Sequence, residues 1–157
     1  MNAGMDDLYR EVILDHHRSP RCREPLAHAD AQAAGRNPSC GDEVTLQLAF
    51  DGDCISGVSV HTEGCAIARA SGSILGELLA GRTLAEASRL AEAFRGIMHD
   101  DEAELADDLN PGDLEVLTGV RKFPVRVKCA LLPWITLLEA MTARQEGRQV
   151  GESTTEV

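Results

Sequence analysis

The stretch Asn37-Pro38-Ser39-Cys40-Gly41-Asp42 is the point around which the rest of the chain is arranged. Its Asn, Pro, Ser and Gly residues favour a turn, and the turn places a thiol and a carboxylate two positions apart. From Glu43 to Phe50 apolar and polar side chains then alternate, which predicts a strand with one buried face. Asp51-Gly52 predicts a hairpin, with a return strand from about Cys54 to Thr62. Two chemically reactive side chains are therefore expected where a β-hairpin begins.

Amphipathic helices are expected on both sides of this hairpin, because apolar residues recur there every three to four positions. The expected segments are Asp6 to His17, Cys65 up to Gly81, Thr83 to Phe94, Asp113 to Val120, and a last helix from Leu131 or Leu132 onward. The last helix is given this start because Pro133 is tolerated in a first turn but not deep inside a helix. His28 to Ala34 alternates weakly and predicts a short edge strand. The fold class is therefore α+β: a small antiparallel three-stranded sheet packed against about five helices, with a metal site at one end.

The length and charge of the chain limit its possible functions. Its 157 residues predict a single domain, residues 1–157, with flexible ends near 1–4 and 145–157. A net charge of −11 argues against a nucleic-acid partner, whose phosphates would be repelled. No run of about 18 apolar residues predicts a membrane span, and the first residues lack the pattern of an export signal. We expect a cytoplasmic protein whose partners are other proteins.

Three of the five cysteines stand where predicted elements begin or end. Cys40 lies in the turn before the first strand of the hairpin, Cys65 at a strand-to-helix junction, and Cys129 at the mouth of the last helix. Together with Asp42 they offer three thiolates and one carboxylate, a set that suits tetrahedral zinc. We therefore expect Cys40, Asp42, Cys65 and Cys129 to bind one metal ion. A closed structural zinc site remains an alternative, but the carboxylate favours a site that opens.

Other conspicuous residues have simpler interpretations. Cys22 and Cys54 are expected to behave as small apolar side chains. His16-His17 ends the first helix, where a protonated imidazole interacts favourably with the helix C-terminus. The acidic stretch from His99 to Asp108 lacks the ligand rhythm of a calcium loop and predicts a solvated loop or short helix.

These motifs resemble those of SufU proteins, a branch of the wider family of IscU and NifU N-terminal assembly proteins. The resemblance runs from about Met5 to Met141. It rests on Leu8-Tyr9-Arg10, Asp15-His16, Asn37 to Asp42, Gly64-Cys65-Ala66-Ile67, Gly119-Val120 and Phe123 to Ala130.

The resemblance implies a zinc-dependent sulfurtransferase that works in iron–sulfur cluster assembly. By position, Cys40, Asp42, Cys65 and Cys129 look like the family's zinc ligands, and Cys40 looks like the catalytic thiol that receives persulfide sulfur. The implied partners are a pyridoxal-phosphate-dependent cysteine desulfurase of the SufS type and a downstream cluster scaffold of the SufBCD type. The family is also known for an exchange in which a desulfurase histidine replaces the acceptor cysteine on zinc.

Two features separate this chain from the IscU scaffolds: the segment between Cys65 and Cys129 resembles the longer SufU version, and the scaffolds carry a histidine immediately before the third cysteine. Here Lys128 occupies that place. Lys128 and Arg126 are interpreted either as surface charges or as groups that balance the thiolates or contact the partner. Two alternatives for the function stay open: a scaffold on which iron and sulfide form a [2Fe–2S] cluster at the same residues, and a zinc-stabilised interaction domain.

Overall fold

The computed structural model describes residues 3–148 and 151–154. Its helices are α1 (Ala3–Arg18), α2 (Ala66–Leu79), α3 (Leu84–Ile97), α4 (Asp113–Leu117) and α5 (Val127–Gln145). Its strands are β1 (Ala31–Asn37), β2 (Asp42–Asp51), β3 (Cys54–Glu63) and β4 (Gly151–Thr154). Three short 3-10 helices, η1 (Asp107–Leu109), η2 (Thr118–Lys122) and η3 (Pro124–Arg126), lie between α3 and α5. None of the helices in the described residues is long and apolar enough to cross a bilayer.

The strands form one sheet in the order β3-β2-β1-β4. The predicted three-stranded antiparallel sheet is confirmed, since β2 pairs antiparallel with both β1 and β3. The fourth strand was not predicted: β4 pairs in parallel with β1, with Ala33 opposite Gly151. Hence β1 is an inner strand rather than an edge strand, and it runs to Asn37 instead of Ala34. The sequence of β4, Gly-Glu-Ser-Thr, shows no apolar alternation, because its place depends on backbone pairing along β1.

The expectation of flexible ends stays a prediction, and the segments concerned contain regular structure. At the N-terminus α1 already begins at Ala3, and at the C-terminus α5 reaches Gln145 and β4 covers Gly151–Thr154. The remaining residues of the expected flexible ends, 1–2, 149–150 and 155–157, lie outside the described residues.

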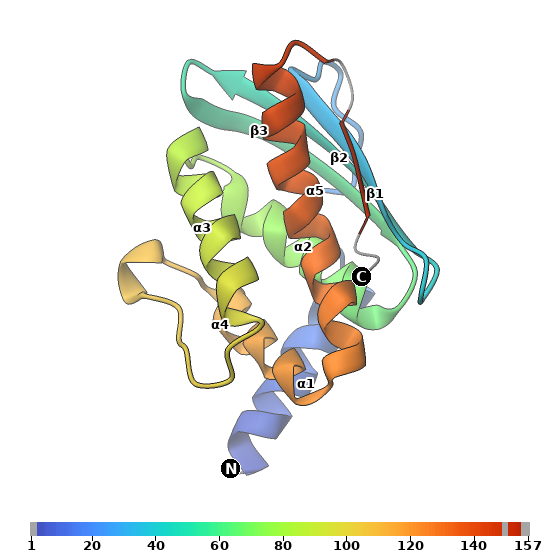
Figure 1. The fold of residues 1–157 in the computed structure, drawn as a ribbon, viewed down its shortest axis with the longest axis vertical. Helices are drawn as coiled ribbons and strands as arrows, with labels where there is room; N and C mark the ends of the chain where they lie inside the picture. The colour runs from blue at the N-terminus through green and yellow to red at the C-terminus, as the bar shows by residue number, and fades with distance from the viewer. Residues whose placement is uncertain (1–2, 149–150, 155–157) are drawn as a thin grey trace.

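The helices gather on one face of the sheet, and α5 runs along it (Figure 1). The alternation predicted for the hairpin is confirmed, because Val44, Leu46 and Leu48 are buried and the residues between them are more exposed. The register of β2 and β3 shifts between Ala49 and Phe50, so β3 carries a bulge next to Gly57. Aliphatic side chains fill most of the core, and its largest aromatic contact joins Phe94 to Trp134 with ring centroids 5.7 Å apart.

A side-chain cap fixes the start of α3. The Thr83 hydroxyl accepts from the Glu86 N–H and the Glu86 carboxylate accepts from the Thr83 N–H, so the two residues form a capping box. The predicted start of α5 is wrong: the helix begins at Val127, and Pro133 lies inside it. A proline costs one backbone hydrogen bond there, but Leu131, Leu132 and Trp134 around it are buried, and this packing outweighs the local preference.

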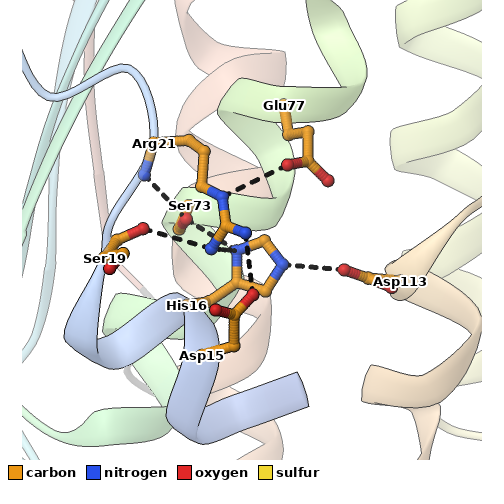
Figure 2. Close-up of polar contacts among 7 residues, drawn as sticks. All are labelled: Asp15, His16, Ser19, Arg21, Ser73, Glu77 and Asp113. Carbon is orange, nitrogen blue, oxygen red and sulfur yellow. Dashed lines mark hydrogen bonds and ion pairs between the residues drawn. The ribbon is translucent and has the colours of Figure 1, made fainter.

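A buried polar cluster fixes α1 against α2 and α4 (Figure 2). His16 is fully buried; its Nδ1 lies 2.7 Å from Ser73 Oγ and its Nε2 lies 2.8 Å from Asp113 Oδ2. The Arg21 N–H donates to Ser73 Oγ, which leaves the hydroxyl hydrogen for His16 Nδ1, so Nε2–H donates to Asp113. The sequence-based interpretation of His16 as a helix-end charge is therefore incomplete, because its ring connects three helices.

We expect His16→Ala to lower the free energy of unfolding by about 3 kcal/mol, since it removes buried hydrogen bonds and leaves a cavity. Chemical denaturation monitored by circular dichroism measures this change. His28→Ala is the matched control: the His28 side chain is 80% exposed, and its loss should cost no more than about 0.5 kcal/mol. Equal effects of the two substitutions would contradict a structural role for the cluster.

Candidate metal centre

Cys40 is held at the surface by the turn between β1 and β2. The N–H groups of Cys40 and Gly41 both donate to the Asn37 carbonyl oxygen, at 3.3 and 2.9 Å. Gly41 has a φ of +73°, a conformation that favours glycine. The Cys40 side chain is exposed, so its thiol is accessible from outside the molecule.

Asp42 is the first residue of β2, and its carboxylate points inward. It is 1% exposed. Its Oδ1 accepts from the Cys65 N–H at 2.9 Å, and its Oδ2 accepts from Asn37 Nδ2 at 3.2 Å. One carboxylate therefore ties the turn before the hairpin to the start of α2.

Cys65 and Cys129 reach the same point from two helix starts. Cys65 is the N-cap of α2, where its sulfur accepts from the Ala68 N–H at 3.4 Å. Its Sγ lies 3.9 Å from Asp42 Oδ2. Cys129 is in the first turn of α5 and is fully buried, and its Sγ lies 3.5 Å from the Sγ of Cys40. The four side chains singled out in the sequence are thus brought together.

The donor set fits one tetrahedral ion. Ligand atoms of Cys40, Asp42 and Cys129 all lie within 4.8 Å of one another. Two sulfurs that each lie ~2.3 Å from a tetrahedral zinc ion are about 3.8 Å apart. The 3.5 Å between Cys40 and Cys129 is close to that value. Cys65 is outside this mutual set, but its Sγ lies 3.9 Å from Asp42 Oδ2, so it stands beside the three as a candidate fourth donor.

The pKa values of Cys65 and Cys129 are shifted in opposite directions. A hydrogen bond from Cys129 lowers the pKa of Cys65 to about 6, and the Ala68 N–H also lowers it. Burial and the charge of Asp42 act in the opposite direction but do not outweigh these hydrogen bonds. The same hydrogen bond, together with burial, raises the pKa of Cys129. Of these two thiols, Cys65 is therefore the one that loses its proton first. It lies at the N-terminus of α2, where the helix dipole also favours a negative charge.

Arg126 and Lys128 differ in their relation to the centre. The charge of Cys65 and a hydrogen bond with Cys129 raise the pKa of Arg126, so this exposed guanidinium lies beside the thiols. Lys128 is half-buried, and within residues 3–148 no hydrogen bond or ion pair joins it to the four donors.

Two residues of the centre were not recognised as functional from the sequence. Asn37 is fully buried, and its Nδ2 lies 3.2 Å from Asp42 Oδ2 and 3.5 Å from Cys129 Sγ. Gly64 has a φ of +134°, and a Cβ there would collide with the Asp42 carboxylate. Both belong to the quoted motifs, Asn37 to Asp42 and Gly64 to Ile67, and that membership was the signal that the sequence offered.

A second group of candidate donors, His16, Glu77 and Asp113, is better explained as a hydrogen-bond cluster. The Arg21 guanidinium lies among them, with Nε 3.2 Å from Glu77 and Nη1 3.2 Å from His16 Nδ1. Figure 2 shows it between Glu77 and His16. A cation already fills the position that a metal ion would need.

The fold and the thiol cluster are those of an iron–sulfur cluster assembly protein. The chain belongs to the family of NifU-like N-terminal domains, whose model matches residues 8–130. Within that family, the zinc-dependent sulfurtransferase SufU of Bacillus subtilis is 38% identical over 93% of this chain and 97% of its own length. The iron–sulfur cluster assembly scaffold protein IscU of Streptococcus pyogenes is 35% identical over 88% of this chain and 86% of its own.

A solved structure agrees with this assignment. SufU from Fervidobacterium islandicum, a candidate iron–sulfur cluster assembly scaffold protein for the SUF system, superposes with a TM-score of 0.78 at 36% identity. The superposition covers 86% of this chain and 97% of that one. The resemblance to SufU and IscU seen in the sequence is therefore confirmed.

We expect Gly64→Ala to weaken metal affinity by about tenfold to a hundredfold, because the added Cβ displaces Asp42. Titration with Co²⁺, followed by thiolate-to-metal absorption, measures the affinity. Gly52→Ala is the matched control, since Gly52 also has a positive φ of +64° but no atom within 4 Å of the added Cβ. If both variants bind Co²⁺ like the parent protein, Asp42 does not depend on Gly64 for its position.

Proposed function

We propose that the protein is a zinc-dependent sulfurtransferase that accepts persulfide sulfur on Cys40 and passes it towards iron–sulfur cluster assembly. The observation that carries the proposal is the contrast in exposure within the thiol cluster. Cys40 is exposed, whereas Asp42 and Cys129 behind it are buried. A partner can therefore reach one sulfur while the other donors stay in place.

Zinc suits the four donors, and when bound it would keep the coordinated thiols deprotonated without taking part in redox chemistry. Cys40, Asp42, Cys65 and Cys129 are the proposed ligands. The hydrogen bonds of Asp42 to Asn37 and to the Cys65 N–H hold its carboxylate independently of any metal. This preorganised carboxylate would remain with Cys65 and Cys129 when Cys40 leaves the set to react.

The transfer step is a thiol exchange. The Cys40 thiolate attacks the outer sulfur of a persulfide on the donor cysteine, a new sulfur–sulfur bond forms on Cys40, and the donor cysteine leaves as a thiolate. The proton on the outer sulfur stays with it, so no external oxidant or reductant is needed. Arg126 stands beside the thiols and is proposed to offset their negative charge during the exchange. Lys128 is proposed to contribute only at longer range or at the partner surface.

The proposed sulfur donor is a pyridoxal-phosphate-dependent cysteine desulfurase of the SufS type. The proposed recipient is a cluster scaffold of the SufBCD type, and the proposed location is the cytoplasm. The similarity to SufU of Bacillus subtilis, named as a zinc-dependent sulfurtransferase, supports this assignment.

A second function is favoured by other relatives, since IscU of Streptococcus pyogenes is named as a scaffold protein. In that case the same four residues would hold iron during assembly of a [2Fe–2S] cluster. Metal and acid-labile sulfide analysis of the purified protein separates the two: about one zinc per chain and no colour supports sulfur transfer. Bound iron with sulfide supports the scaffold.

We expect Cys40→Ala to abolish stimulation of a cysteine desulfurase and to remove the persulfide found on this protein by mass spectrometry. The loss follows because no other exposed thiol belongs to the cluster in the described residues. Cys54→Ala is the matched control: Cys54 is exposed but lies in the hairpin away from the centre, so both readouts should stay unchanged. Persulfide that persists in Cys40→Ala would identify another acceptor.

Asp42→Ala should lower zinc affinity at least about tenfold, since it removes one donor and the carboxylate that orders Cys65. A competitive titration with a chromogenic chelator measures this. Glu43→Ala changes the neighbouring exposed carboxylate on β2 and should leave the affinity as it is. Unchanged affinity in Asp42→Ala would remove Asp42 from the ligand set.

A further inference from the structure

A narrow recess lies beside the outer edge of the sheet, between β3, α2 and the loop that follows α1. Its volume is about 20 Å³, and it is lined by Pro20, Arg23, Val60, His61, Thr62, Arg69 and Ser73. A wider groove of about 570 Å³ shares two of these residues, Arg23 and His61, and extends over Thr45, Gln47 and Ser59 on the polar face of the sheet. The proposed sulfur-transfer chemistry uses neither space.

Two polar atoms in the recess lack a partner. Arg69 Nε and Thr62 Oγ1 are buried, and neither has a hydrogen-bond partner within residues 3–148 and 151–154. The Arg69 Nε–H can only donate, and the Thr62 hydroxyl can also donate. Buried polar groups are nearly always paired in folded proteins, so two unpaired groups in one recess indicate a missing acceptor.

Two arginines at the recess also favour a negatively charged ligand. Arg23 and Arg69 form no ion pair with any carboxylate in the part of the chain that the structure describes, although the chain has a net charge of −11. Some arginines elsewhere on the surface pair with acids, as Arg89 does with Asp108 and Arg95 with Glu92. Two carboxylates lie near the site: Glu24 lines the groove, and Glu63 lies 3.4 Å from His61 Nε2 rather than against an arginine.

We propose that this recess and the mouth of the groove bind an oxyanion, either a phosphate or a carboxylate. One anion oxygen enters the recess and accepts from Arg69 Nε–H and the Thr62 hydroxyl. A volume near 20 Å³ holds one oxygen but not the whole anion. The remainder lies between Arg23 and His61 in the groove, where the Arg23 guanidinium supplies further donors.

The position of the site gives it a connection to the metal centre. Thr62 precedes Cys65 by three residues, and Arg69 follows it by one turn of α2, where its N–H donates to the Cys65 carbonyl oxygen. An anion held by these two residues therefore lies against the segment that carries Cys65. The proposal does not depend on sulfur transfer, because it rests on the unpaired groups alone.

The test titrates the full-length, metal-loaded protein with inorganic phosphate and, separately, with acetate, at constant ionic strength. The resonance of the Arg69 Nε–H group, followed by ¹H–¹⁵N spectroscopy, reports binding directly. We expect a saturable shift, and the anion that saturates at the lower concentration identifies the ligand class. The parallel measurement of metal content keeps this result separate from the metal-centre proposal.

Two variants and one control decide the outcome. Arg69→Met keeps the aliphatic stem without the donors and should weaken binding at least tenfold, read from the shifts of the Thr62 and Arg23 amides. Thr62→Val, which preserves shape, should weaken it severalfold, whereas Arg89→Met should leave it unchanged. Non-saturating shifts with both anions, or equal affinity in Arg69→Met and the parent protein, would mean that the recess holds only water and would overturn the proposal.

Discussion

The burial of one carboxylate, that of Asp42, is the constraint on which the arrangement of the metal centre depends. A carboxylate that is 1% exposed must be hydrogen-bonded or bound to a cation. Asp42 meets this demand by accepting from the Asn37 side chain and from the N–H of Cys65. The turn before β2 and the start of α2 are thereby locked together. Since Asn37 also contacts Cys129, the start of α5 joins the same point.

This constraint explains why the thiols are chemically distinct. Cys65 caps a helix and has a lowered pKa, Cys129 is buried in the first turn of α5 and has a raised pKa, and Cys40 lies outside on a turn. One thiol is thus accessible while the others are supported from within. Such an arrangement favours reaction at Cys40 without disassembly of the site, which is what a sulfur acceptor requires.

Helix α2 links the polar features of the molecule. Cys65, Arg69 and Ser73 follow one another at four-residue intervals and so lie along one side of the helix. Cys65 belongs to the candidate metal centre, Arg69 to the recess proposed for an oxyanion, and Ser73 to both the recess and the His16 cluster. The apolar side chains of α2, among them Ile74 and Leu75, are buried in the core. The polar side of α2 therefore joins these sites while its apolar side packs in the core.

The sequence by itself determined the elements whose signals are local. Alternation specified the hairpin, the Thr83 capping box began α3, and turn residues framed Cys40 and Asp42. Only the tertiary structure decided the features that depend on distant partners: β4 pairs through its backbone, and α5 passes through Pro133 because its surroundings are buried. Burial of His16, the pairing of Asn37 with Asp42, and the unpaired Arg69 belong to the same class. Their physical reason is that hydrogen-bond satisfaction and burial are set by residues far away in the chain, which no local pattern reveals.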